Sequence, residues 1–481
     1  MKKIFALILM TVFIFSCNNQ NSRKQLTVLT NFIPAQQRYL RNEVLEKFEN
    51  LYKCKINLVN YENNDELKRL LLEDANPQIA LVSIPLEMTQ NLVLANKITP
   101  MTDIVAPHVL LFDVASYYYK FSDVGRIKGI YYYLPHRIEM PVLFYMKSKA
   151  FAAIEKFGVY KTEINDSLKA INGFGLPYGY ALEENPNDWD LYDIFVIGYI
   201  WGKEKKGDNN GGFILTHEMK SYSILNMLYY NAFALGAKPE EFVNMSGEAV
   251  EEVFLWEMVF GKYKIFNALS YKTDISSADI YYAFKNEEIF MAYFSQNDCF
   301  NILEGTSESN MIPYIFDVSD VGIALVPLIV PFSLDSGGNL SSKGKRVNVL
   351  QGYYWGIPKS AKEKELAYLL VQYLNNRVVN TKEVVRSGSI PVREDVLMNM
   401  KNIYDERWMG EGYTAALNQI IDYFDDKDWL WDIKNDKFFV YDNYVYMRNV
   451  INSGAPYKTS EINKNTVRSL ISRNFPLKDE K

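Results

Sequence analysis

The sequence predicts an α/β fold, and three observations support this prediction. Between residues 26 and 84, segments with strand character alternate with helical segments, which is typical of a parallel sheet covered by helices. Hydrophobic residues make up 48% of the chain and charged residues 23%, so the chain can bury a large core. Its 481 residues allow two or three domains, or one large two-lobed body, at about 150 residues per domain.

The opening elements follow the order strand, helix, strand, helix, strand. We expect strands at residues 26–29, 55–59 and 79–84, because each is a short apolar run bounded by turn-forming or polar residues. Pro34 is well placed to open the first helix, and the apolar residues of 39–52 recur at helical spacing. A charged helix is expected over residues 65–74.

Farther along, further strands are expected at residues 129–133, 142–146, 289–294 and 321–326. Residues 136–139 are interpreted as a polar turn between the first two of these strands. Residues 181–263 are mostly helical in pattern, and Ser360 with Glu363 forms a capping box before an amphipathic helix. Residues 336–345 are rich in glycine and serine and predict a surface hairpin or loop.

The first 16 residues have the order of a signal peptide. Lys2 and Lys3 precede an apolar run of about a dozen residues, which is too short for the ~20 residues of a membrane-spanning helix. The following Ser16-Cys17 resembles a bacterial lipobox, although Ile14 and the bulky Phe15 match only its relaxed spirochaetal form. We therefore expect export, lipidation of Cys17, a tether over residues 17–24 and anchoring to a bacterial membrane, on the periplasmic face or the cell surface.

Composition and motifs exclude several classes of protein. The net charge of −6 provides no basic surface for nucleic acid. The three histidines are widely separated, and no nucleotide-binding, redox or hydrolase motif is present, so we expect no metal and no cofactor. Cys54 and Cys299 are expected to be separate buried thiols. Aromatic residues reach 15%, which fits either a compositional bias or a ligand site lined with rings.

Several collinear motifs point to one family. They are VLEKFE at 44–49, NPQI at 76–79, GRIKG at 125–129 with VLFYMK at 142–147, AFKNEE at 283–288 followed by FMA at 290–292, and SIPVR at 389–393. In this order the chain resembles the maltose-binding-protein-like solute-binding proteins of carbohydrate-type ABC importers, over about residues 26–397. The resemblance implies a two-lobed periplasmic-binding-protein fold of type II, in which each lobe is a sheet flanked by helices and the ligand cleft lies between the lobes. The implied lobe 1 is 25–137 plus 327–388, and lobe 2 is 138–326 plus 389–481.

The resemblance also implies a function. A monomeric lipoprotein that catalyses no reaction would capture a small solute, a sugar or an oligosaccharide, and deliver it to an ABC transporter permease when its lobes close. Three alternatives remain open. They are a binding protein for a peptide or another polar metabolite, an exported glycoside hydrolase that uses carboxylates such as Glu139 and Asp298, and a surface lipoprotein retained for adhesion.

Positions that match the family's cleft provide the candidate ligand-binding residues. They lie after the first strand, after the third strand, in the turn at 136–139, in a turn after residue 295 where the family often has a tryptophan, and in the segment from residue 351. Strand alternation places Tyr353 and Trp355 on one face. The candidates are Asn31, Phe32, Ser83, His136, Arg137, Glu139, Gln296, Asn297, Asp298, Gln351, Tyr353 and Trp355.

Overall fold

The computed structural model describes most of residues 23–399 together with residues 461–474. Within 23–399 the description omits residues 33, 63, 74–78, 140, 206–210, 215–227, 229–230, 239, 242–243, 272–276, 296–297, 299–318, 343, 347–350 and 388. The signal segment with Cys17 therefore lies outside the described residues, as do Gln296, Asn297 and Cys299. In the part of the chain that is described, no helix is both long enough and apolar enough to cross a membrane.

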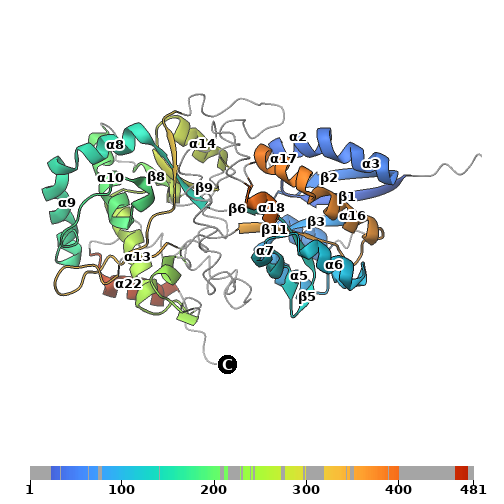
Figure 1. Ribbon diagram of the computed structural model, residues 1–481. Helices are drawn as coiled ribbons and strands as arrows, with labels where there is room; N and C mark the ends of the chain where they lie inside the picture. Colours follow the sequence, from blue (N-terminus) through green and yellow to red (C-terminus); the bar gives the residue numbers. More distant parts are fainter. Residues whose placement is uncertain are drawn as a thin grey trace, which may run out of the picture.

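The first lobe is built on a five-stranded sheet with the order β2-β1-β3-β11-β6 (Figure 1). Strands β1 (Lys24–Thr30), β2 (Cys54–Asn60) and β3 (Ile79–Pro85) run parallel, while β11 (Gln351–Gly356) runs antiparallel to both β3 and β6 (Tyr133–Glu139). Strand β6 is therefore parallel to β1 and β3. The carboxyl ends of these three strands and the amino end of β11 meet at one edge of the sheet.

Helices cover both the faces and the ends of this sheet, as the strand–helix alternation predicts. Pro34 opens the first of them, and the helical path to Tyr52 passes through a π-helical turn. The helices of lobe 1 are α2 (Pro34–Tyr39), α3 (Glu46–Tyr52), α4 (Asn64–Lys68), α5 (Thr89–Leu94), α6 (Pro107–Val114), α7 (Tyr119–Val124), α16 (Lys364–Leu374), α17 (Arg377–Ser387) and α18 (Glu394–Leu397).

The second lobe contains a four-stranded sheet with the order β10-β7-β9-β8. Its strands are β7 (Pro141–Met146), β8 (Phe213–Ile214), β9 (Met291–Ser295) and β10 (Val321–Ala324). Around this sheet lie α8 (Lys147–Glu155), α9 (Phe157–Asn172), α10 (Leu191–Glu204), α13 (Glu248–Lys262), α14 (Ser277–Lys285) and α22 (Lys464–Asn474) (Figure 1).

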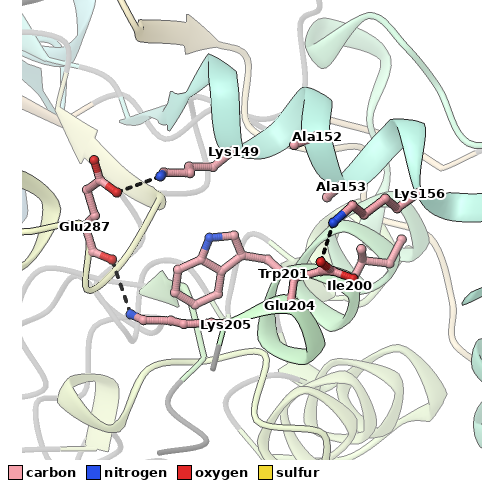
Figure 2. A pocket seen from close by; sticks show the side chains of 9 residues that line it. All are labelled: Lys149, Ala152, Ala153, Lys156, Ile200, Trp201, Glu204, Lys205 and Glu287. Carbon is pink, nitrogen blue, oxygen red and sulfur yellow. Dashed lines mark hydrogen bonds and ion pairs between the residues drawn. The ribbon is translucent and has the colours of Figure 1, made fainter. Parts of the chain in front are cut away.

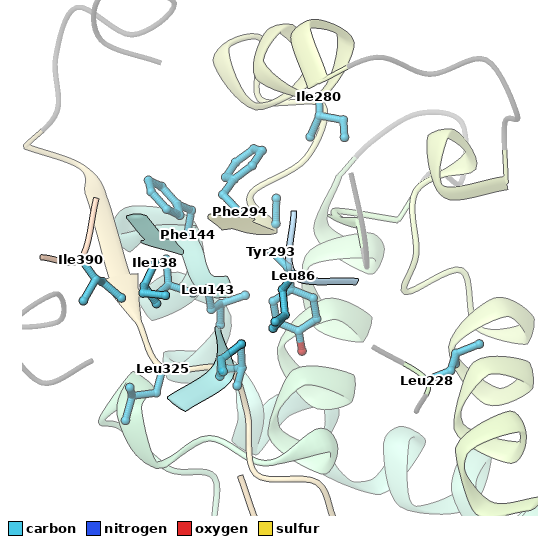
Figure 3. Packing of buried hydrophobic residues seen from close by; sticks show 14 of the residues in the cluster. Leu86, Ile138, Leu143, Phe144, Leu228, Ile280, Tyr293, Phe294, Leu325 and Ile390 are labelled. Carbon is cyan, nitrogen blue, oxygen red and sulfur yellow. The ribbon is translucent and has the colours of Figure 1, made fainter. Parts of the chain in front are cut away.

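The chain passes from one sheet to the other between β6 and β7, which end and begin at Glu139 and Pro141. Apolar residues on both sides of this passage belong to one continuous buried cluster. Figure 3 shows part of it, where Phe144 of β7 and Phe294 of β9 pack edge to face with ring centroids 5.2 Å apart. The short passage therefore fixes the position of the last residues of β6 at the boundary between the lobes.

Backbone contacts contradict two of the predicted lobe boundaries. Leu328 donates its backbone N–H to Trp189 O over 2.8 Å, and the Trp256 indole donates to Val330 O, so the segment after residue 327 packs on lobe 2. By contrast, the Ile390 N–H donates to Ile138 O over 2.9 Å, so the segment after residue 389 packs on lobe 1. Each segment joins the lobe whose backbone groups satisfy its own hydrogen bonds, which motif order does not reveal.

Two local predictions are also wrong. Residues 136–139 are not a turn but the end of β6, and all four are buried, because this strand is covered on both faces. The capping box is absent as well. Helix α16 begins at Lys364, and Glu363 caps it without a side-chain bond and pairs with Lys24 instead. The predicted apolar face of α16 is confirmed, since Leu366, Leu370 and Leu374 are buried.

Stability should fall as pH rises because of one carboxyl group in lobe 2. Burial raises the pKa of Glu257 on α13 from 4.5 to about 8. Between these values the folded protein holds a proton that the unfolded chain releases, so the unfolded state binds fewer protons and rising pH favours unfolding. Between pH 4.5 and about 8, the free energy of unfolding should fall less steeply with pH in Glu257→Gln than in the parent protein, by about 1.4 kcal/mol per pH unit. Urea unfolding of both proteins at several pH values measures the difference, and parallel pH profiles would contradict the assignment.

Candidate functional site

The candidate site lies at the edge of the lobe 1 sheet where three strands end and β11 begins. Asn31 and Phe32 follow β1, and Glu139 ends β6 beside Gln351, its register partner on β11. Tyr353 is opposite Arg137 in the same pair of strands. Loops at the carboxyl ends of parallel strands commonly form binding sites, since side chains from several strands converge there. Sheet topology thus brings together residues more than 300 positions apart in sequence.

Arg137 is the charged centre of this edge and is only 3% exposed. Its Nη1 donates to Gln36 Oε1 over 2.8 Å, and its guanidinium lies 4.0 Å from the centroid of the Tyr353 ring. Its Nε is 2.6 Å from Glu139 Oε1, close enough for an ion pair although the N–H is not aligned as a hydrogen bond. Burial is the largest single effect and lowers the pKa of Arg137, but Glu139, together with Tyr353, Tyr61 and Glu383, raises it overall.

His136, the residue before Arg137 in β6, is also buried. Its Nδ1 is 3.1 Å from Ser83 Oγ, and its Nε2 is 3.3 Å from Glu383 Oε1. The imidazole stacks on Trp355 with centroids 4.1 Å apart, and the edge of Phe32 approaches it at 5.2 Å. Burial lowers the pKa of His136, even though Glu383 acts in the opposite direction, so the ring is neutral near pH 7.

The side chains at the rim of the site are Asn31 and Tyr353, which are both partly exposed. The Asn31 amide donates to the Tyr353 hydroxyl over 3.1 Å, and its Oδ1 is 3.5 Å from Arg137 Nη2. An amide has both donors and an acceptor, and a phenol has one donor and also accepts. A ring beside a planar amide can cover an apolar face of a ligand while bonding to its hydroxyl groups.

Trp355 lies deeper than the sequence suggests. The Trp355 ring meets Phe32 and His136, the Tyr353 ring lies under Arg137 of β6, and Tyr354 is buried. Trp355 is 0% exposed, and its Nε1 has no hydrogen-bond partner among the described residues. In this conformation the indole supports His136 and leaves no open face for a ligand.

In lobe 2, the described candidate is Asp298, which is 8% exposed. It accepts hydrogen bonds from the Tyr281 hydroxyl and, over 2.8 Å, from the Ser295 backbone N–H. These contacts close the turn after β9, next to Pro141 of β7 in the register. Ser295 and Asp298 therefore lie near the lobe boundary. Asp298 itself is engaged in shaping the turn, while its neighbours Gln296 and Asn297 lie outside the described residues.

Sequence reasoning missed two members of the cluster, Gln36 and Glu383. Gln36 on α2 is 0% exposed, and its amide donates to Glu383 of α17 while its carbonyl accepts from Arg137. Gln36 could have been suspected, because it lies within the first turn of a helix opened by Pro34 at the end of β1. Glu383 gave no signal, since only the packing of α17 on α2 brings it to His136.

The described residues hold no group of three or more histidine, cysteine, aspartate or glutamate side chains arranged to bind a metal. Cys54 is a buried free thiol, as predicted for that residue.

The two carboxylates named for glycoside hydrolysis have separate partners: Glu139 contacts Arg137, and Asp298 contacts Tyr281 and the Ser295 N–H. The side chain of Gln351 lies outside the described part of the chain.

Comparison with known proteins establishes the fold. No family profile matches the sequence, and no curated protein sequence matches it. Many solved structures do match. They include maltose-bound MalE3 of T. maritima (TM-score 0.65, 12% identity, 94% of this chain and 98% of that chain). A second is a solute-binding protein of an ABC transporter from Thermotoga lettingae bound with α-D-tagatose (TM-score 0.63, 15% identity, 94% and 99%).

A third similar structure is the GacH receptor of Streptomyces glaucescens, described without ligand and with acarbose (TM-score 0.63, 12% identity, 95% of this chain and 100% of that chain). These likenesses extend over nearly the whole length of each protein. The chain therefore has the two-lobed, type II periplasmic-binding-protein fold that the motif order predicts, with a sheet and its helices in each lobe.

Proposed function

We propose that this protein captures a sugar or an oligosaccharide between its lobes and delivers it to an ABC transporter permease, without catalysing a reaction. One observation carries the proposal: the partly exposed Asn31 and Tyr353 stand over a buried Arg137–Glu139 pair at the lobe boundary. The similar structures that hold maltose, tagatose or acarbose support it, because they share the fold around that boundary.

The proposed mechanism is differential binding. A ligand that contacts both Tyr353 and the turn near Asp298 stabilises the closed arrangement of the lobes, and the closed form is the one that a permease would read. Export and a lipid anchor at Cys17 belong to the same proposal, as they would hold the protein on the membrane of its transporter.

The binding function can be tested on the mature protein by identifying its ligand. Mass spectrometry of co-purified small molecules, followed by calorimetric titration with a panel of mono- and oligosaccharides, should reveal saturable sugar binding. Small-angle scattering should then show a smaller radius of gyration with the bound sugar. If peptides bind and sugars do not, the protein is a peptide-binding protein and the sugar proposal is wrong. Release of a reducing sugar from glycosides, lost in Glu139→Gln, would support the hydrolase alternative.

Truncating the rim aromatic should weaken ligand binding more than it weakens the fold. Tyr353→Ala removes a ring and a hydroxyl that we place against the sugar, so we expect a loss of about 1–3 kcal/mol in binding, which is roughly 5- to 150-fold. Tyr131→Ala is the matched control, since Arg126 also lies over that ring at 5.9 Å in the same lobe. Titration calorimetry compares the variants, and equal affinities in the two would remove Tyr353 from the site.

A further inference from the structure

Lobe 2 has a pocket that is separate from the candidate site. It has a volume of about 260 Å³ and lies between α8, α10 and the turn before β9 (Figure 2). Lys149 and Lys156 lie on α8 after the end of β7, Glu287 precedes the start of β9, and Glu204 and Lys205 are at the end of α10. The lobe boundary is at the opposite end of β7 and β9. The length of β7, at about 3.3 Å per residue, separates the two places by roughly 20 Å.

The wall of the pocket is apolar. It is formed by Ala152, Ala153, Ile200 and the indole of Trp201. Phe290 stacks on Trp201 with centroids 5.0 Å apart, which fixes the indole in place. In Figure 2 the Trp201 ring borders the open space, and its nitrogen is on the side that faces Lys149. A flat apolar body of a ligand would fit against this wall.

The rim of the pocket carries one more positive than negative side chain. It contains three lysines and two glutamates, and both carboxylates are already paired: Glu287 with Lys149 over 2.6 Å, and Glu204 with Lys156. Lys205 contacts no carboxylate among the described residues. Its ammonium is 3.2 Å from the carbonyl of Glu287 and 4.4 Å from the centroid of Trp201.

The Lys205 ammonium donates to the backbone carbonyls of Glu287 and Glu288, over 3.2 and 3.3 Å, but these are neutral acceptors. A cation held only by neutral acceptors attracts an anionic one. Burial lowers the pKa of Lys205, in keeping with a cation that its surroundings do not fully compensate. The pocket thus combines a net positive charge at Lys205 with the aromatic wall of Trp201, which favours an anionic group on a flat or apolar body.

We propose that this pocket is a second ligand site, which binds a small organic acid with its carboxylate at Lys205 and its apolar body against Trp201. The site is independent of the sugar site proposed above, because the two share no residue. Its occupant would be a monocarboxylate with a ring or a short chain, since the pocket provides donors on one side and an apolar surface on the other.

The test uses the mature protein and three probe acids: benzoate, indole-3-acetate and hexanoate. Saturation-transfer NMR and calorimetric titration should show saturable binding of at least one acid, with a dissociation constant of about 1 mM or tighter. Benzyl alcohol, the neutral partner of benzoate, should bind at least about tenfold more weakly if benzoate binds. Lack of saturable binding for all three acids, or equal binding of the neutral compound, would overturn the proposal.

Variants of residues in the pocket test whether the acid binds there. Lys205→Met should weaken the acid by about tenfold or more, and Ala152→Phe should block the pocket from its exposed rim. Lys161→Met is the matched control, because Lys161 lies over Phe157 at 5.6 Å but lines no part of this pocket. Sugar affinity should stay unchanged in all three variants, so the two proposals fail separately. Equal acid affinity in Lys205→Met and Lys161→Met would place the acid elsewhere.

Discussion

Replacing Arg137 with methionine is expected to destabilise the folded protein by about 3–5 kcal/mol, as measured by urea unfolding without ligand. Arg137 is 3% exposed and Glu139 is 6% exposed, so the substitution leaves a buried carboxylate without its principal counter-charge. It also removes the hydrogen bond to Gln36 and the cation over Tyr353. The methionine keeps much of the apolar stem, so lost charge and lost hydrogen bonds dominate the effect.

Arg126→Met provides the matched comparison. Arg126 also has a carboxylate partner, Asp123 at 3.8 Å, and an aromatic neighbour, but its side chain is about half exposed. An exposed pair is worth about 0–1 kcal/mol, so this variant should be nearly as stable as the parent protein. Adding Glu139→Gln to Arg137→Met should recover part of the loss, because it removes the uncompensated charge. Similar stability of the two arginine variants would mean that the buried pair does not hold the edge of the sheet.

Replacing Trp355 with alanine should cost about 3–5 kcal/mol of stability even without ligand, because it empties a fully buried site in the core. The indole stacks on His136 and meets the edge of Phe32, with centroids 4.1 and 6.2 Å away. Strand alternation alone places Trp355 beside Tyr353 and suggests a ligand contact with little effect on the apo protein. Because the ring is buried, we instead expect the loss of apo stability to exceed the loss of ligand affinity.

Trp355→Phe separates packing from ligand contact. Phenylalanine retains a ring against His136 and removes an indole N–H that has no partner in the described residues, so it should cost less than alanine. Thermal and urea unfolding of the apo variants gives the stability change, and sugar titration of the folded fraction gives the affinity change. An apo melting temperature close to that of the parent in Trp355→Ala would show that the ring is not part of the core.

The sequence was a good guide to the elements and a weaker guide to the site. The three opening strands and the Pro34 helix are where the periodicity places them, because short apolar runs and a proline at a helix start carry local signals. Residues 136–139 gave the opposite signal, since three polar or charged residues in four are typical of a turn. In the structure they form a buried strand, because Ser83, Glu383, Gln36 and Glu139 provide their partners.

By itself, the sequence determined the α/β class, the order of strands and helices, and the two-lobed architecture that the motif order implied. The class and the order of the elements follow from residue type and spacing along the chain, whereas the two lobes were implied by the family resemblance. Only the tertiary structure decided that Arg137 and His136 are buried, that Gln36 and Glu383 belong with them, and on which lobe the segments after residues 327 and 389 pack. The reason is physical: a polar group is buried only where partners compensate its desolvation, and those partners come from elements up to 347 residues apart in sequence.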